Sequence, residues 1–323
     1  METNIPILNE FLYYLLCVRN YSKQTAIGYS RDLRRFFRFI INYLELNIKP
    51  KDINVFVLGK IEESTIIQFL IYLNYYENNS PSTRGRIITS IKSFYKWLFY
   101  KYSVTLKNKH NPTLNIPSID KIERLPKYIR LKDAKRIESI FNENNSRFYE
   151  RNNAIMVLFL NTGLRVSELI SINKDDIDFI NKKVKVIGKG NKERTVYLNN
   201  ICIDTINNYL KTRDDEEKAL FINSKKQRFK IRGVEEICEK AFKLSNLETF
   251  NYTTHTLRHT AATYLYKSSH DILVVKEFLG HSSLNSTEIY THIMPEILKD
   301  AVNKNPLNEW ATKKGGKNHN KVQ

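Results

Sequence analysis

A tyrosine near the end of the chain, in the stretch STEIYTH at residues 286–292, raises the question of what chemistry it could carry out. A phenol is a weak nucleophile at neutral pH, because its reference pKa is about 10. Tyr290 can therefore act as a nucleophile only if other side chains accept its proton and stabilise the charge that its attack creates. Four short segments of the sequence offer such side chains.

Two of these segments place a single cation at a turn. In TGLRVSEL, an apolar helix is predicted to end near Gly163, and Arg165 stands where the next helix begins. In GKGNKER, Lys189 lies between two glycines at a predicted hairpin tip. Flanking glycines let a backbone come close to a ligand, so this lysine could carry a proton or contact a phosphate. Read alone, each cation could equally be a solvated surface residue.

The third segment, HTLRHTAATYLY, predicts a helix that carries both an arginine and histidines. His255, Arg258 and His259 fall on one helical face by the i, i+3, i+4 rule, while a separate apolar face would anchor the helix. Histidines at i and i+4 can also chelate zinc, but the metalloprotease pattern needs Glu where this chain has Thr256. A metal site is therefore not expected, and His259 could instead be a structural histidine.

The fourth segment, LGHSSLNSTEIYTH, contains the tyrosine itself. His281 follows a glycine that is predicted to end a helix, and Tyr290 lies nine residues later on a short helix that starts near Ser283. His292 has no assigned role.

Together these side chains suit attack on a DNA phosphodiester. Two guanidinium groups, of Arg165 and Arg258, can hold the non-bridging oxygens with paired hydrogen bonds and neutralise the charge that develops there. The histidines can accept the phenol proton or donate to the phosphate. Lys189 can protonate the departing alkoxide, and Tyr290 then carries the phosphoryl group. This chemistry requires no metal.

Composition agrees with a polyanionic partner. Lysine and arginine exceed aspartate and glutamate by 52 to 34, a net charge of +18, and residues 1–125 and 126–323 both have a positive excess. Such a balance favours nucleic acid, with a merely soluble basic protein as the alternative. No apolar run is long enough for a membrane span, so a cytoplasmic, nucleoid-associated protein is expected. The three separated cysteines, Cys17, Cys202 and Cys238, are each predicted to be small buried residues.

The first part of the chain predicts a helical domain. Apolar stripes over residues 22–46 (Ala26 to Leu44) and 82–100 indicate two amphipathic helices. A basic and hydroxyl-bearing face opposes each stripe and could contact DNA phosphates, or could simply be solvated. The proposed DNA-binding residues are Arg31, Arg34, Arg35, Arg38, Arg86, Thr89, Ser93 and Lys96.

A proline-containing stretch at residues 106–127 predicts a linker, so the domains are expected at 1–105 and 128–305, with a disordered tail at 306–323. The second domain mixes helices with three short antiparallel strands. Their alternating residues are Ile177 and Phe179, then Val184 and Val186, then Thr195 and Tyr197. After residue 199 the pattern is helical again to about residue 303. The expected fold is thus mainly α with a small antiparallel β-sheet.

This set of side chains resembles the active-site set of the tyrosine recombinases in type and in order. Its members are Arg165, Lys189, His255, Arg258, His281 and Tyr290. The phrases TGLRVSEL, HTLRHTAAT and LGHSSLNSTEIYTH are similar to the family's motifs, and the two-domain layout is similar to its Xer-type members. The resemblance is strong for residues 126–295 and looser for 1–105. It implies a helical, SAM-like core-binding domain followed by an α+β catalytic domain.

The resemblance also implies a reaction and its partners. Tyr290 would form a 3′-phosphotyrosyl link and release a 5′-hydroxyl, with no cofactor, and Glu168 matches an acidic position behind the catalytic groups. His259 is likewise assigned a supporting role behind the catalytic groups. Four subunits, alone or together with a related recombinase, would exchange strands through a Holliday junction on duplex DNA with specific sites. A C-terminal helix with Leu298, Ala301 and Val302 would dock on a neighbouring subunit, or else on its own domain.

Other classes of protein remain as alternatives. A type IB topoisomerase would use a similar pocket as a monomer, and the helical N-terminal part argues against it. A non-catalytic DNA-binding protein would explain the charge but not the catalytic-type residues. A metal-dependent nuclease would need carboxylates around two cations. The one dense acidic cluster is Asp175, Asp176 and Asp178.

Overall fold

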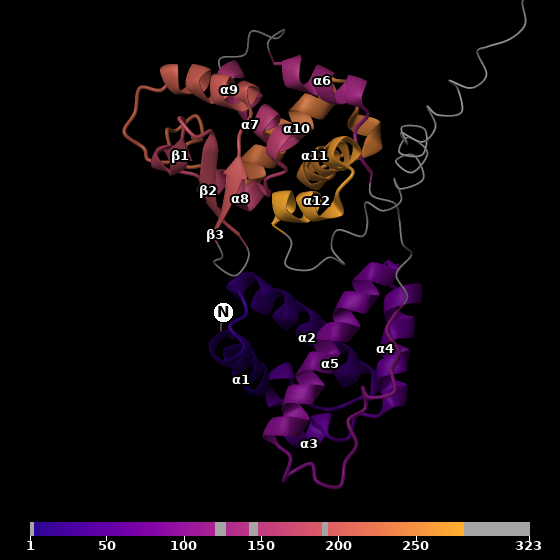
Figure 1. Ribbon diagram of the computed structural model, residues 1–323. Coiled ribbons are helices and arrows are strands. Elements are labelled where there is room, and N and C mark those ends of the chain that lie inside the picture. Colours follow the sequence, from indigo (N-terminus) through magenta and orange to yellow (C-terminus); the bar gives the residue numbers. More distant parts are fainter. Residues whose placement is uncertain (1–2, 120–126, 142–147, 189–192, 281–323) are drawn as a thin grey trace, which may run out of the picture. The chain divides into compact units, whose positions relative to one another are not determined.

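The computed structural model describes residues 3–119, 127–141, 148–188 and 193–280. The chain divides into two compact units, Met1–Arg124 and Leu125–Gln323 (Figure 1). The first is helical, and the second combines helices with one three-stranded antiparallel sheet, which confirms the predicted fold class. Among the residues that the structure describes, no helix has both the length and the apolar character needed to span a bilayer.

The two long helices of the first unit, α2 and α5, each begin at a serine that caps the helix. The side-chain oxygens of Ser22 and Ser80 accept backbone N–H groups one turn into α2 and α5. Its elements are α1 (Pro6–Tyr13), a π-helical turn (Tyr14–Val18), α2 (Lys23–Tyr43), a 3₁₀ helix (Pro50–Asp52), α3 (Val55–Leu58), α4 (Glu63–Tyr75) and α5 (Pro81–Lys101). Both predicted amphipathic helices are confirmed.

The core of this unit lies between α2, α4 and α5. Phe36 of α2 packs on Phe69 of α4, with ring centroids 5.2 Å apart, and both rings are fully buried. The predicted stripe is buried at Ala26, Leu33, Phe37 and Ile40 and half-buried at Tyr29, but Leu44 is exposed because α2 ends at Tyr43. Leu106 and Ile116, from the stretch predicted to be a linker, are buried in the same core. The domain limits given above, 1–105 and 128–305, stay a prediction.

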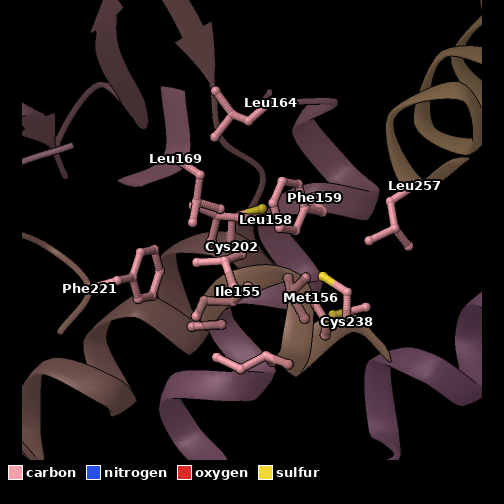
Figure 2. Packing of buried hydrophobic residues seen from close by; sticks show 14 of the residues in the cluster. Ile155, Met156, Leu158, Phe159, Leu164, Leu169, Cys202, Phe221, Cys238 and Leu257 are labelled. Atoms are coloured by element: carbon pink, nitrogen blue, oxygen red, sulfur yellow. The ribbon is translucent and has the colours of Figure 1, made fainter. Parts of the chain in front are cut away.

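The second unit is wound around α7 (Tyr149–Thr162), which is buried on nearly every side. Figure 2 shows the packing of apolar side chains around it. Ile155, Met156 and Phe159 of this helix contribute to one continuous apolar core. The other helices are α6 (Leu131–Ser139), α8 (Val166–Ser171), α9 (Asn200–Lys211), α10 (Ile231–Leu244), α11 (Thr254–Ser269) and α12 (Ile272–Leu279), with 3₁₀ helices at Lys174–Asp176 and Glu248–Phe250. After residue 199 the described part of the chain is again helical, as predicted, with a loop between α9 and α10.

The sheet consists of β1 (Ile177–Asp178), β2 (Lys183–Ile187) and β3 (Glu193–Tyr197) in that order, and it contacts α8. Val184 pairs with Val196, and Val186 pairs with Arg194. The three predicted strands are confirmed, but the alternating residues named for the third strand lie on its exposed face. Tyr197 is 76% exposed, Thr195 is also exposed, and Val196 is buried. A shift of one residue in a strand exchanges its two faces.

The cysteines divide between core and surface. Cys202 of α9 and Cys238 of α10 are buried as predicted (Figure 2), and burial raises the pKa of the Cys202 thiol to about 12. Cys17 is exposed, so its predicted burial is wrong. It lies in the π-helical turn after α1, where neighbouring Val18 is also turned to solvent.

Candidate active site

Arg165 is held at the junction where α7 ends and α8 begins. Gly163 closes α7 in the left-handed conformation, with φ of +58°, and Arg165 then caps α8. The backbone N–H of Arg165 donates to Glu168 Oε2 at 2.8 Å, and its Nη1 donates to Glu168 Oε1 at 2.8 Å. The Arg165 side chain remains 31% exposed. The Glu168 carboxylate thus fixes both the backbone and the side chain of Arg165, while that side chain stays partly exposed.

Glu168 is shared by three arginines. Its side chain is 1% exposed, and its Oε2 accepts from Arg194 Nη2 at 2.9 Å and lies 3.9 Å from Arg258 Nη1. Burial by itself raises the pKa of Glu168, but the hydrogen bonds and charges of Arg194 and Arg165 outweigh it and lower the pKa overall. The ionised carboxylate leaves this cluster with a net positive charge, which suits an incoming anion.

Arg258 joins the ends of two other helices. It lies on α11 with its side chain 7% exposed. It donates from Nη1 to the carbonyl of Gly163, and from Nη2 to the carbonyl of Leu279 at 2.6 Å. The last carbonyls of a helix attract cations, so the ends of α7 and α12 are natural partners for it. The predicted pair Arg165 and Arg258 is therefore brought together at one place.

Two glycines allow these segments to approach so closely. A Cβ atom added to Gly163 would lie 2.9 Å from Phe278 Cε1. One added to Gly280, which ends α12 with φ of +62°, would lie 2.5 Å from Arg194 Cδ. A side chain at either position would require Phe278 or Arg194 to shift.

The two histidines of α11 differ in exposure. His255 is exposed, whereas His259 is half-buried. Desolvation, and then the nearby positive charges of His255 and Arg258, lower the pKa of His259. The lowered pKa disfavours the cationic form of His259, which fits a supporting role better than a cationic one.

Part of the predicted set lies outside the described residues. Lys189, His281 and Tyr290 are among these, as are His292, the predicted C-terminal helix and the tail after residue 305. The described strands β2 and β3 flank the segment with Lys189, and α12 leads directly to His281.

The acidic cluster has ordinary local roles. Asp176 accepts the backbone N–H of Asn173 at 2.7 Å and caps a 3₁₀ helix, and Asp178 accepts two hydrogen bonds from Asn181. No group of three or more metal-binding side chains occurs in the described ranges.

The basic face of the first unit is only partly free for a ligand. Arg31, Arg34 and Arg38 are exposed on α2. Arg35, in contrast, is paired with Glu77, and Arg86 is paired with Asp32, a carboxylate that is 2% exposed. On α5, Lys96 and Thr89 are exposed and Ser93 is half-buried.

Arg194 is a site residue that the sequence reasoning missed. It is the second residue of β3, and its side chain is 14% exposed because it points to the same face as Val196. A cation at an inward strand position needs a buried carboxylate, which would have been the signal for its role. The alternating residues named for this strand, Thr195 and Tyr197, lie on the opposite face, so the pattern did not point to Arg194.

Family models match both units of the chain. The phage integrase family model covers residues 127–296, and the model of the phage integrase N-terminal SAM-like domain covers residues 8–101. Tyrosine recombinase XerC of Caldanaerobacter subterraneus is 40% identical over 94% of this chain and 88% of its own length. The chain belongs to the phage integrase family. It is a Xer-like tyrosine recombinase, as the resemblance implied, and hence a site-specific enzyme that breaks and rejoins DNA.

Further relatives agree with this membership. Tyrosine recombinase XerD of Listeria monocytogenes is 31% identical over 91% of this chain and 96% of its own. The fold is shared with the crystal structure of XerH site-specific recombinase bound to its palindromic difH substrate in a post-cleavage complex. That match has a TM-score of 0.71 at 22% identity, and it covers 88% of this chain and 81% of that one.

We predict that Glu168→Gln lowers the stability of this recombinase at neutral pH by about 3 kcal/mol, because three arginines lose their buried counter-charge. The folded pKa of Glu168 lies below its ordinary value of 4.5, so the carboxylate stabilises the fold above that pH. This contribution is lost as pH falls through the folded pKa. Urea unfolding from pH 7 to pH 3 should show the two proteins converging in acid, and a constant difference would contradict the electrostatic role.

Proposed function

We propose that Tyr290 is the nucleophile of this recombinase and that Arg165 and Arg258 stabilise the phosphate that it attacks. The phenolic oxygen forms a bond to phosphorus as the bond from phosphorus to the 5′-oxygen breaks. A histidine, His255 or His281, takes the phenol proton, and Lys189 protonates the 5′-oxygen. The product is a 3′-phosphotyrosyl link and a free 5′-hydroxyl.

The observation that carries this proposal is the shared carboxylate of Glu168, which orients Arg165 and lies beside Arg258. Two guanidiniums fixed in advance need not reorganise as charge develops, and this preorganisation is a large source of catalysis. Rejoining is the reverse reaction, in which a 5′-hydroxyl from another strand attacks the phosphotyrosine. One ester replaces another at each step, so no cofactor is needed to supply energy.

We further propose duplex DNA with specific recombination sites as the substrate, and a tetramer, of this chain alone or with a related recombinase, as the active assembly. The helical unit acts as the core-binding domain and the second unit as the catalytic domain. Strand exchange then passes through a Holliday junction in the cytoplasm, at the nucleoid. The likeness to XerC and XerD favours resolution of chromosome dimers over integration, excision or inversion.

The proposal is tested with a duplex whose site is first selected from random sequences by the full-length protein. A nick beside the scissile phosphate lets the short strand with the 5′-hydroxyl diffuse away and traps the covalent intermediate. We expect a protease-sensitive protein–DNA band on a denaturing gel. A protein that binds the selected duplex tightly but never yields this band would overturn the proposed function.

Lys189→Ala should slow cleavage far more than it weakens DNA binding, because its proposed task is to protonate the leaving oxygen. Loss of general acid catalysis typically costs 10² to about 10⁴-fold in rate. Single-turnover cleavage and equilibrium binding to the same duplex measure the two effects. Equal losses in both would reduce Lys189 to a contact with the DNA backbone.

Substitution of two arginines of the first unit should affect different properties, DNA binding for one and stability for the other. Arg34→Ala removes an exposed charge and should lower the salt dependence of DNA binding by about one counterion, with unchanged melting temperature. Arg86→Ala leaves buried Asp32 without its ion pair and should lower the unfolding free energy by about 1–3 kcal/mol. Titrations at several salt concentrations and thermal melts test both, and an unchanged salt slope in Arg34→Ala would exclude its phosphate contact.

A further inference from the structure

Arg194 is bound on two sides by groups of the candidate site. Its Nη2 donates to Glu168 Oε2 at 2.9 Å, and its Nε lies 3.5 Å from Glu168 Oε1. Its Nη1 donates to the carbonyl of Phe278 at 2.8 Å, and its Cδ fills the space beside Gly280. Each of the three guanidinium nitrogens is thus engaged within the protein, which leaves Arg194 poorly placed to hold DNA itself.

The arrangement of Arg194 mirrors that of Arg258. Arg194 reaches from β3 to the carbonyl of Phe278, and Arg258 reaches from α11 to the carbonyl of the next residue, Leu279. Both arginines also approach the same oxygen of Glu168, at 2.9 Å and 3.9 Å. The carboxylate and the end of α12 therefore form a common support for the two side chains.

We infer that Arg194 is a positioning residue, which fixes the Glu168 carboxylate and the end of α12 so that Arg165 and Arg258 are aligned for the scissile phosphate. This inference rests on the proposed function. Without Arg194, Glu168 loses one of its two hydrogen-bonded guanidinium groups, and the Phe278 carbonyl loses its donor. The carboxylate that orients Arg165 is then free to shift, and a shift of about 1 Å in a catalytic group can cost 100-fold in rate.

Arg194→Lys is the informative variant because it keeps the positive charge. A lysine is a single point donor and cannot span a carboxylate and a carbonyl as the planar guanidinium does. The variant thus removes the alignment while it leaves the net charge of the protein, and hence the long-range attraction to DNA, unchanged.

The test compares two forms of the nicked duplex, in full-length protein. One has an ordinary scissile phosphodiester, and the other has a methylphosphonate, in which a methyl group replaces one non-bridging oxygen and removes the negative charge. If Arg194 acts by aligning the two guanidiniums, Arg194→Lys should slow adduct formation about 100-fold on the phosphodiester. On the neutral phosphonate, where less charge needs stabilising, its rate should come close to that of the wild type.

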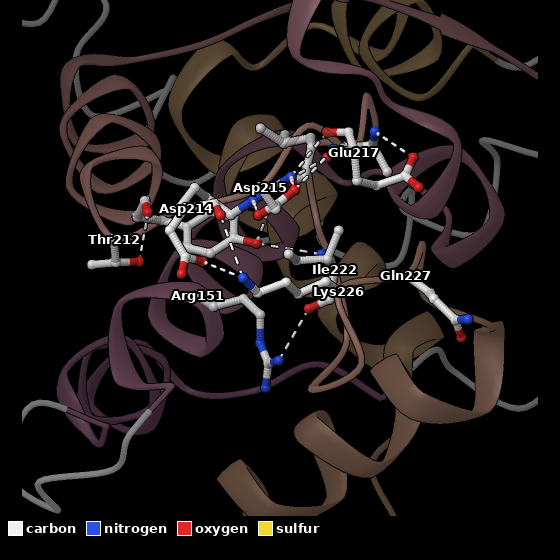
Figure 3. A network of polar contacts seen from close by, with 12 residues as sticks. Arg151, Thr212, Asp214, Asp215, Glu217, Ile222, Lys226 and Gln227 are labelled. Atoms are coloured by element: carbon white, nitrogen blue, oxygen red, sulfur yellow. Dashed lines mark hydrogen bonds and ion pairs between the residues drawn. The ribbon is translucent and has the colours of Figure 1, made fainter.

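Arg213→Lys is the matched control, because Arg213 is also buried, paired with an acid and bonded to carbonyls. It pairs with Asp215 and donates to the carbonyls of Ala219 and Glu217. Figure 3 shows Asp215 and Glu217 within a network of polar contacts in the loop between α9 and α10. This variant should lose thermal stability, yet its relative rates on the two substrates should match those of the wild type.

The outcomes separate the two proposals. A wild-type protein that forms no adduct overturns the proposed function, and this inference with it. In a second outcome the wild type reacts, but Arg194→Lys is slowed equally on both substrates, in proportion to its loss of melting temperature, as in Arg213→Lys. Arg194 is then merely structural, and the inference alone fails. Selective recovery on the phosphonate confirms the positioning role.

Discussion

Tyr290→Phe is expected to abolish the covalent protein–DNA adduct while DNA binding stays unchanged. The substitution removes one oxygen and no charge, so contacts with phosphates are preserved. Removal of the nucleophile from an enzyme that forms a covalent intermediate costs at least about 10⁴-fold in rate. The adduct band on the nicked duplex measures cleavage, and gel-shift titration measures affinity.

The control for this variant is Tyr197→Phe. Tyr197 is a 76% exposed tyrosine of the same catalytic unit, on β3, and its hydroxyl has no place in the proposed reaction. It should form the adduct at the wild-type rate. An adduct that persists in Tyr290→Phe would refute the assignment of the nucleophile, whatever the behaviour of the control.

Arg258→Lys has the second largest expected effect, a loss of cleavage of about 100- to 1,000-fold, because one preorganised donor to the developing charge is removed. Lysine also cannot bridge the carbonyls of Gly163 and Leu279 as Arg258 does. The variant should therefore be less stable as well as slower, and single-turnover cleavage with thermal melting resolves the two effects.

Arg228→Lys provides the comparison for Arg258→Lys. Arg228 donates to the carbonyls of Ile170 and Ile172 at 2.7 and 3.3 Å, so it too bridges backbone groups, but it takes no part in the proposed reaction. If cleavage by Arg258→Lys falls no further than cleavage by Arg228→Lys at equal stability, a direct role for Arg258 at the phosphate is wrong.

Local sequence signals were sufficient to predict the helices and turns that carry Arg165, His255 and Arg258. Gly163 marks the end of α7, Arg165 begins α8, and helical periodicity places His255 and Arg258 one turn apart. These features depend on backbone geometry within a few residues, so a single sequence can predict them. The strands β1, β2 and β3 were predictable for the same reason.

Features that depend on distant partners could not be predicted in this way. Arg35 and Arg86 looked alike on a basic face, yet each is paired with an acid from another segment. Asp32 interrupts the apolar side of α2 and gave no sign of its partner on α5. The inward direction of Arg194 depends on the register of β2 and β3, which alternation alone does not determine.

The most direct measurement of the central claim is the identity of the residue joined to DNA. The trapped adduct of the full-length protein is digested with protease and nuclease, and the remaining peptide–nucleotide conjugate is sequenced by mass spectrometry. We predict a conjugate in which the oxygen of Tyr290 carries a 3′-phosphate, with a 5′-hydroxyl on the released strand. A conjugate at any other side chain, or a link to a 5′-phosphate, would contradict the account.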